Sequence, residues 1–412
     1  MFSRPFRIGL LCAGLAGFAL HGTTAPAGEA GLTRPQAYSR AAALEMLGRK
    51  MFADPSLSGS GQLACASCHS PQHAFGPPND LAVQLGGKTM RETGFRAAPS
   101  LRYLQAVPQF TEHYYESDDE GDASVDNGPT GGLSWDGRID RGRDQARIPL
   151  LSAFEMANDN EEAVAAELRK AAYAADIKAI FGDTVFDDKA KTLAAALEAL
   201  EVYEQNDKDF YPYSSKYDAY LAGRAQLTTQ EARGLAAFDD PARGNCGNCH
   251  RSRRGNDGTP PQFTDYGLIA IGVPRNRDIA ANADPKFFDL GACGPLRTDL
   301  AKRAEYCGIF RTPSLRNVAL RKKLYHNGSV ASLREAIAFY VERDTRPEKW
   351  YPRRADGTVA KFDDLPAQYH DNINREPPFG GKPGDRPALS PAEIDDIVAF
   401  LGTLTDGYSR AP

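Results

Sequence analysis

The 412-residue sequence is poor in several residue types, and each scarcity narrows what the protein can be. It has two tryptophans and five methionines. No methionine follows residue 156, so a metal ion held by the second half of the chain cannot have a methionine of that half as a ligand. After residue 27 no apolar run is long enough to span a membrane, so we expect no membrane insertion. The net charge of −5 argues against nucleic acid and anionic membrane surfaces as partners.

Most of the seven cysteines belong to a pattern that occurs twice. The pattern Cys-x-x-Cys-His is the attachment site of a c-type haem, in which both sulfurs form thioethers and the histidine binds the iron. A four-cysteine zinc site is the alternative, but it leaves both histidines unexplained. We therefore predict two covalently bound haem c groups. The two copies consist of Cys65, Cys68 and His69, and of Cys246, Cys249 and His250.

The first 27 residues have the features of an export signal. Arg4 and Arg7 precede an apolar stretch over 8–20, and Ala25-Pro-Ala27 offers a cleavage site. The sequence therefore predicts a periplasmic protein. In that oxidising compartment Cys293 and Cys307, which the haems leave over, are expected to form a disulfide; two separate buried thiols are the alternative.

An internal repeat precedes the two haem motifs, and a helical pattern closes each half, over 188–204 and 390–401. We predict a mainly α fold of two cytochrome c-type domains with long loops and one covalent haem each. The first domain covers 28–205, a linker covers 206–227 and the second domain covers 228–412. The repeat matches Gly48, Phe52, Asp54 and Pro55 with Gly234, Phe238, Asp240 and Pro241.

Two further segments carry a family resemblance. The first is Trp135-Asp-Gly-Arg138 with Gln145, Pro149 and Glu155, and the second is the stretch 310–317 followed by His326-Asn-Gly. Together they resemble the bacterial dihaem cytochrome c peroxidases and the MauG-type enzymes over most of the mature chain. The resemblance implies an enzyme that reacts with hydrogen peroxide.

The resemblance also implies roles for these residues. Trp135 would lie between the two haems as an electron relay, and Glu155 would act as a general acid and base over the first haem, with Gln145 and Pro149 in the same pocket. His326 would lie beside the second haem. The alternatives are a tryptophan of the core and a glutamate of the surface.

The residue on the far side of the iron from each binding histidine decides whether that haem is open to peroxide. No histidine stands where the peroxidases place a loop histidine above the first haem, so the His69 haem is expected to be open; His113 reaching back is the alternative. Above the second haem, Tyr340 occupies the place of the usual methionine, which is the MauG-like pattern. A phenolate favours oxidised iron, and the alternative is a tyrosine of the core.

Calcium is a point where the sequence departs from the family. The resemblance implies a calcium ion held by an Asn side chain and by backbone carbonyls near a Thr-x-Pro. Here Ala97 replaces the Asn, and Arg321-Lys-Lys323 replaces the Thr-x-Pro region. Calcium is therefore left open, and a lysine or arginine could supply its charge.

The resulting functional hypothesis is a dihaem peroxidase-like oxidoreductase. It would react with hydrogen peroxide at the open haem and take electrons through the His250/Tyr340 haem from a small cytochrome, a cupredoxin or a small molecule. One alternative is MauG-like oxidation of a partner protein, although Gly244 stands where MauG has a surface tryptophan. A dihaem electron carrier without catalytic activity is an alternative of another class.

Overall fold

The computed structural model describes residues 32–115 and 126–409. The predicted export signal at 1–27 and an acidic stretch at 116–122 lie outside the described residues. Contacts within the chain separate residues 1–40 from a second compact unit, Ala41–Pro412, and the site lies in the second unit. In the part of the chain that the structure describes, no helix is long and apolar enough to cross a membrane.

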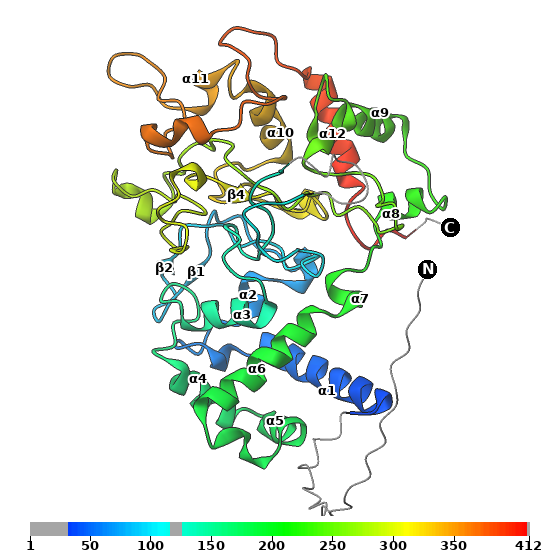
Figure 1. The fold of residues 1–412 in the computed structure, drawn as a ribbon, viewed down its shortest axis with the longest axis vertical. Helices are drawn as coiled ribbons and strands as arrows, with labels where there is room; N and C mark the ends of the chain where they lie inside the picture. Colours follow the sequence, from blue (N-terminus) through cyan, green and yellow to red (C-terminus); the bar gives the residue numbers. More distant parts are fainter. Residues whose placement is uncertain (1–31, 116–125, 410–412) are drawn as a thin grey trace, which may run out of the picture. The chain divides into compact units, whose positions relative to one another are not determined.

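The secondary structure is mainly helical, as predicted, and the strands of the described residues form two pairs, with two residues in each strand. The pairs are antiparallel and link β1 (Leu85–Gly86) with β2 (Glu92–Thr93) and β3 (Leu268–Ile269) with β4 (Phe310–Arg311). Long loops connect the helices (Figure 1). The helices are α1 Arg34–Phe52, α2 Cys65–Cys68, α3 Gly142–Leu151, α4 Glu161–Lys170, α5 Ala174–Phe181, α6 Lys189–Glu204, α7 Asp207–Phe210, α8 Lys216–Leu221, α9 Thr229–Asp239, α10 Leu333–Glu342, α11 Pro347–Trp350 and α12 Pro391–Gly402.

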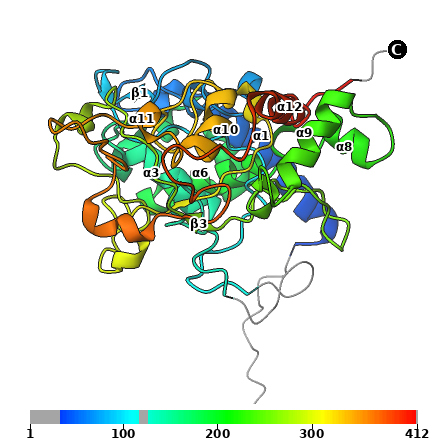
Figure 2. The ribbon, with the colours of Figure 1, turned by 90° about the horizontal axis from the view of Figure 1, so that it is seen from above.

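The repeated sequence pattern forms the same helix contact twice. α9 and α12 lie side by side in both views (Figures 1 and 2), and a Cβ on Gly234 would collide with the carbonyl oxygen of Asp396. Gly48 of α1 meets the carbonyl of Ala199 in α6 in the same way. Each repeated glycine therefore permits a close helix crossing that a larger residue would block.

The repeated phenylalanines pack beneath these crossings. Phe52 meets Tyr203 of α6 edge-on at 5.4 Å between ring centroids, and Phe238 meets Phe400 of α12 at 5.3 Å. Both phenylalanines are almost completely buried, in two separate hydrophobic clusters. A third cluster, around Phe339, is built largely from the long loops.

The segment predicted as a linker is packed rather than extended. It contains α7 and α8, and its Phe210 and Tyr217 are buried in the first and the second cluster, respectively. Nothing in the packing fixes a boundary between two domains, so that division stays a prediction.

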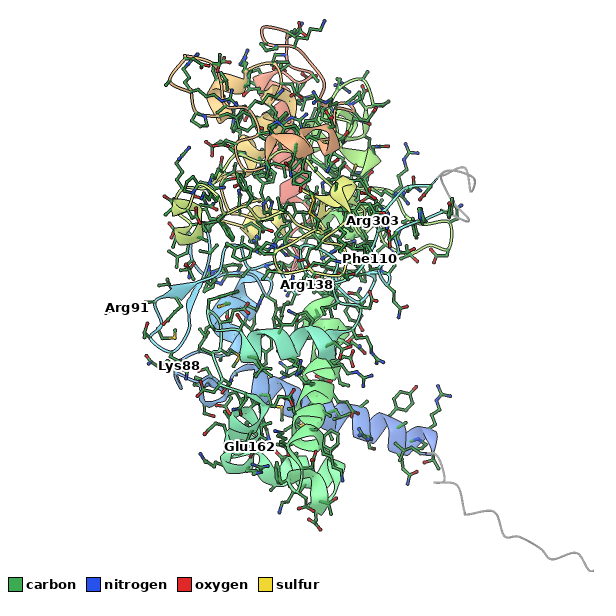
Figure 3. The ribbon with its side chains drawn as sticks, turned by 60° about the vertical axis from the view of Figure 1, so that its left-hand side comes forward. Lys88, Arg91, Phe110, Arg138, Glu162 and Arg303 are labelled. Carbon is green, nitrogen blue, oxygen red and sulfur yellow. A yellow bond between two sulfur atoms is a disulfide. The ribbon has the colours of Figure 1, made fainter. Side chains whose placement is uncertain are left out.

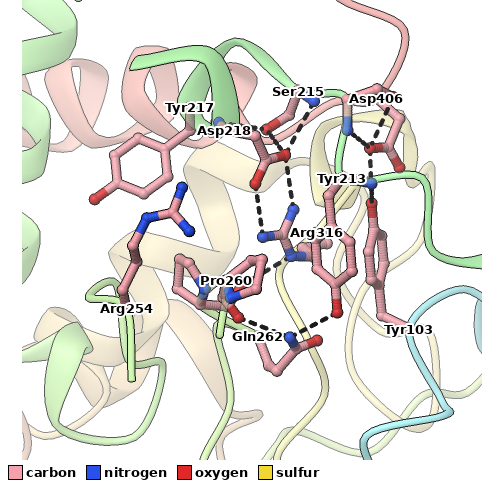
Figure 4. Close-up of polar contacts among 12 residues, drawn as sticks. Tyr103, Tyr213, Ser215, Tyr217, Asp218, Arg254, Pro260, Gln262, Arg316 and Asp406 are labelled. Carbon is pink, nitrogen blue, oxygen red and sulfur yellow. Dashed lines mark hydrogen bonds and ion pairs between the residues drawn. The ribbon is translucent and has the colours of Figure 1, made fainter. Parts of the chain in front are cut away.

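A buried ion pair ties this segment to the second half of the chain (Figure 4). The Arg316 guanidinium contacts both oxygens of Asp218, at 3.0 and 2.9 Å, and lies 4.7 Å from the ring centroids of Tyr103 and Tyr213. The Tyr103 hydroxyl donates to Asp406 at 2.7 Å. Burying these charges is tolerable because each has its partners.

Candidate haem sites

The first Cys-x-x-Cys-His motif forms a single helical turn, α2. The His69 amide donates to the carbonyl of Cys65 at 2.9 Å, and His69 Nδ1 lies 3.1 Å from the carbonyl oxygen of Phe75. Because a carbonyl only accepts hydrogen bonds, Nδ1 carries the proton and Nε2 keeps its lone pair. Burial lowers the pKa of His69 to about 4, so the ring is neutral, as an iron ligand must be.

The second motif repeats this geometry. The His250 amide donates to Cys246 at 2.8 Å, and His250 Nδ1 lies 2.9 Å from the carbonyl of Phe263. Burial lowers the pKa of His250 as well. Phe75 and Phe263 both adopt a φ of 54°, in the left-handed region that residues other than glycine rarely occupy. This shared conformation turns each carbonyl toward its histidine.

A serine fixes each of these turns from behind. Ser100 Oγ donates to the carbonyl of Ala74 at 2.6 Å, and Ser314 Oγ donates to that of Gln262 at 2.7 Å. The two serines stand in the sequences Pro-Ser-Leu-Arg at 99–102 and at 313–316. The internal repeat therefore continues well beyond the segment before the motifs. The two matching tetrapeptides are the sequence signal for this longer repeat.

The cysteines of both motifs are available for thioether formation. None of the four forms a disulfide, and burial raises the pKa of each to about 11 or 12, so they are thiols. Cys68 lines one cavity, whereas Cys246 and Cys249 line another. The zinc alternative needs all four cysteines to meet and does not fit this placement. The expected disulfide forms between Cys293 and Cys307.

The first cavity, defined by Cys68 and His69, has a volume of about 800 Å³. The second cavity, defined by Cys246, Cys249 and His250, has a volume of about 270 Å³. Cofactor sites commonly measure roughly 300–1,000 Å³. The first cavity lies within this range and the second lies just below it. In both places free thiols and a neutral histidine adjoin the cavity, and this set of residues fits a covalently attached haem.

The residues predicted to act on peroxide gather at the first cavity. Gln145 and Pro149 lie on α3 and line it, and the chain then folds back so that Glu155 also lines it. The Glu155 amide donates to Ser152 at 3.0 Å and its carbonyl accepts from Gly87 at 2.7 Å, which fixes the backbone. Burial raises the pKa of Glu155, while Arg138 acts in the opposite direction.

Trp135 lies where the two cavities adjoin. It lines both of them, its Nε1–H donates to the carbonyl of Ala97 at 2.8 Å, and its ring lies 6.4 Å from that of His326. Its neighbour Asp136 is completely buried and forms ion pairs with Arg96 at 2.6 Å and with Arg138 at 2.8 Å. Figure 3 shows Arg138 at the level where the blue-to-teal and yellow parts of the chain meet.

The second cavity contains Tyr340 and His326. Tyr340 projects from α10, lines the cavity together with His250, and stacks on Phe379 at 5.2 Å. Burial raises the pKa of Tyr340, so only a cation such as iron would make its phenolate form favourable. His326 stacks on Phe310 at 3.6 Å and has no contact of that kind with the ring of His250.

His113 does not line the first cavity. Its side chain is exposed, and its Nδ1 lies 2.5 Å from the Asp126 carboxylate. This position gives no support to the alternative in which His113 caps the first haem.

Three charged residues line the cavities in places that the sequence did not predict, although Arg321 was among the cations expected to be able to replace the charge of calcium. Arg311 lines both cavities and Arg321 lines the second; neither forms an ion pair with a described carboxylate, and burial lowers the pKa of each to about 10. Glu204 lines the first cavity, and burial raises its pKa to about 8. Charged residues are expected at the surface, so no sequence feature predicted these positions.

Comparisons with known proteins agree with this geometry. A family model described as di-haem cytochrome c peroxidase matches residues 42–226. The chain is 34% identical over 382 residues to the methylamine utilization protein MauG of Paracoccus denitrificans, covering 91% of each chain. The chain belongs to the dihaem cytochrome c peroxidase and MauG family.

Two further relatives place this member within the family. Cytochrome c551 peroxidase of Nitrosomonas europaea is 25% identical over 294 residues, covering 71% of this chain and 70% of the relative. The crystal structure of the diheme peroxidase BthA from Burkholderia thailandensis superposes with a TM-score of 0.76 at 40% identity, covering 88% of this chain and 86% of that one. This family member is therefore a peroxidase enzyme of haem c type, and the recognition made from the sequence is confirmed.

Proposed function

We propose that this peroxidase reacts with hydrogen peroxide at the His69 cavity and exchanges electrons with a donor through the His250/Tyr340 cavity. The observation that supports this division most directly is the placement of Glu155, Gln145 and Pro149 at the first cavity alone. When bound, the two haems would supply an iron centre that reacts with peroxide and a second centre that holds oxidising equivalents.

Glu155 would move the proton. Its raised pKa makes the carboxylate a stronger base, which would help it to take a proton from one peroxide oxygen and return that proton to the departing oxygen. Gln145 would orient the peroxide through its side-chain amide. Pro149 lacks an N–H, so the Gln145 carbonyl has no helical donor at this point, and the helix ends soon afterwards.

Trp135 would carry electrons between the cavities, because its indole lines both and is fixed by a hydrogen bond to Ala97. The two motif histidines differ in their proposed partners. His69 would hold the first haem without a second protein ligand, whereas Tyr340 would help His250 to hold the second haem. His326 would pack beside the second haem.

The location of the protein is part of the proposal. Export to the periplasm is supported by residues 1–27 and by the Cys293–Cys307 disulfide, which suits an oxidising compartment. The electron donor would be a small cytochrome, a cupredoxin or a small molecule. Oxidation of a partner protein is the second candidate function, favoured by the 34% identity to MauG.

Electron paramagnetic resonance of the resting ferric holoenzyme tests the proposal. We expect a high-spin signal from an open haem together with a low-spin signal from a six-coordinate one, and loss of the high-spin signal on addition of peroxide. Two low-spin signals that peroxide leaves unchanged would instead indicate the electron carrier.

A further inference from the structure

Residues 97–98 and 321–323, where the family resemblance implies calcium, do not form a calcium site here. Calcium in proteins takes about six to eight oxygen ligands. Ala97 is buried and offers no side-chain oxygen, and its carbonyl already accepts the Nε1–H of Trp135 at 2.8 Å. The carbonyl of Ala98 accepts a hydrogen bond from Arg321 Nη1 at 2.9 Å. The backbone oxygens of this segment are thus engaged by protein donors.

Arg321 brings a positive charge to this segment. Among the three consecutive cationic residues it alone lines the second cavity, whereas Lys322 is exposed. Its guanidinium forms no ion pair with any carboxylate in the described ranges. Burial lowers the pKa of Arg321 to about 10, which still leaves it charged at neutral pH. Arg321 is only partly exposed, so the protein itself must supply hydrogen-bond partners for its guanidinium, and those partners indicate its role in the fold.

The contacts of Arg321 indicate that role. Besides donating to Ala98, its guanidinium lies against Gly76, where a Cβ would come within 3.2 Å of Nη1. Gly76 directly follows Phe75, whose carbonyl holds His69 Nδ1. Ala98 directly follows Ala97, which holds Trp135. One side chain from the second half of the chain therefore touches both backbone segments that position the first haem ligand and the indole.

We infer that Arg321 is an internal cation that takes the place of a bound calcium ion, so that this enzyme assembles and works without calcium. The guanidinium donates to the carbonyl of Ala98 and packs against Gly76, in the place of a metal ion among its oxygen ligands, but it is covalently part of the chain and cannot dissociate. The inference deepens the proposed function and rests on it only for the role of Trp135.

Calcium titration of the wild-type holoenzyme is the first test. After treatment with EGTA, isothermal titration calorimetry should detect no stoichiometric Ca²⁺ binding, and added Ca²⁺ should change neither the melting temperature nor the ferric spectrum. Stoichiometric binding accompanied by a higher melting temperature would overturn the inference. Because this readout does not involve peroxide, it is independent of the proposed function.

Variants of Arg321 supply the second test. We expect Arg321→Gln to shift the electron paramagnetic resonance signal of the His69 haem and to lower the melting temperature, whereas Arg321→Lys retains the wild-type signal because it keeps a cation. Lys322→Gln is the matched control and should match the wild type. If Arg321→Gln behaves like Lys322→Gln, the inference is wrong; if Arg321→Gln does not fold, the wild-type titration still decides.

Discussion

The two haem motifs have the same structure behind their histidines and different residues in the cavities in front of them. Behind each motif the histidine, the phenylalanine carbonyl, the serine and the glycine helix crossing recur with nearly equal distances. In front, the first cavity has Glu155 and Gln145, whereas the second has Tyr340. The repeat therefore fixes the geometry of the two proposed iron ligands, and the residues outside it would decide how each haem reacts.

The largest effect is expected from a substitution that removes the chemical difference between the two cavities. Glu155→Gln deletes the proposed proton-transfer group and should slow the reaction with peroxide by about 10²–10⁴-fold. Stopped-flow mixing of the ferric holoenzyme with peroxide measures this rate. Glu162→Gln is the control, since that glutamate is exposed on α4 (Figure 3) and pairs only with Arg169. Equal rates in both variants would remove the role of Glu155.

The second-largest effect is expected at the second cavity. Tyr340→Phe removes the phenol oxygen, and we expect the low-spin signal of the second haem to be lost or shifted while the first haem still reacts with peroxide. Resonance Raman and electron paramagnetic resonance spectra of the variant measure this. An unchanged low-spin signal would show that Tyr340 belongs to the core and binds no iron.

The pH dependence of the reaction with peroxide tests the role of Glu155 at the first cavity in a second way. The Glu155 pKa lies above that of an ordinary glutamate, about 4.3, because the carboxyl is buried. As a general base Glu155 must be deprotonated, so the rate should fall as the pH falls through this raised pKa. A pH–rate profile should show this limb in the wild type and lack it in Glu155→Gln. The same limb in both proteins would assign it to another group.

The helix crossings that the two halves share can be tested with matched glycine variants. Gly48→Ala and Gly234→Ala each place a methyl group against a helix carbonyl, and each should destabilise the fold by about 1–3 kcal/mol. Urea unfolding followed by circular dichroism measures both. Gly402→Ala is the control, because a Cβ there meets no atom within 4 Å. A marked difference between the first two variants would contradict the equivalence of the crossings.

The smallest effect concerns the serines. Ser100→Ala and Ser314→Ala each remove the hydroxyl that donates to the turn before a phenylalanine carbonyl, at a cost of about 1 kcal/mol per hydrogen bond. The melting temperatures should fall by similar amounts. A loss confined to one variant would mean that only one turn depends on its serine.

Local patterns predicted much of this structure, because they depend on neighbours in the sequence. Ser390 and Ser332, each followed by a glutamate three residues later, cap α12 and α10, and the local patterns of helix starts are visible in the sequence. Gln145, Pro149 and Glu155, which the family resemblance assigned to one pocket, all line the first cavity.

What the sequence could not predict depends on distant contacts. The segment 206–227 was predicted to be a linker, yet its Asp218 is buried by pairing with Arg316, which lies far away in the chain. Arg321 and Glu204 likewise lie at cavities whose walls come from several segments. The burial of a charge is decided by such partners and has no local pattern.

The hydrogen bond from Trp135 to Ala97 has an electrical consequence as well as a structural one. A carbonyl presents the negative end of its dipole to the donor, so the indole faces a fixed negative potential at Nε1. Such a potential lowers the cost of removing an electron from the ring. The bond that sets the angle of the indole therefore also makes it easier to oxidise, and a shift of the Ala97 backbone would change both properties together.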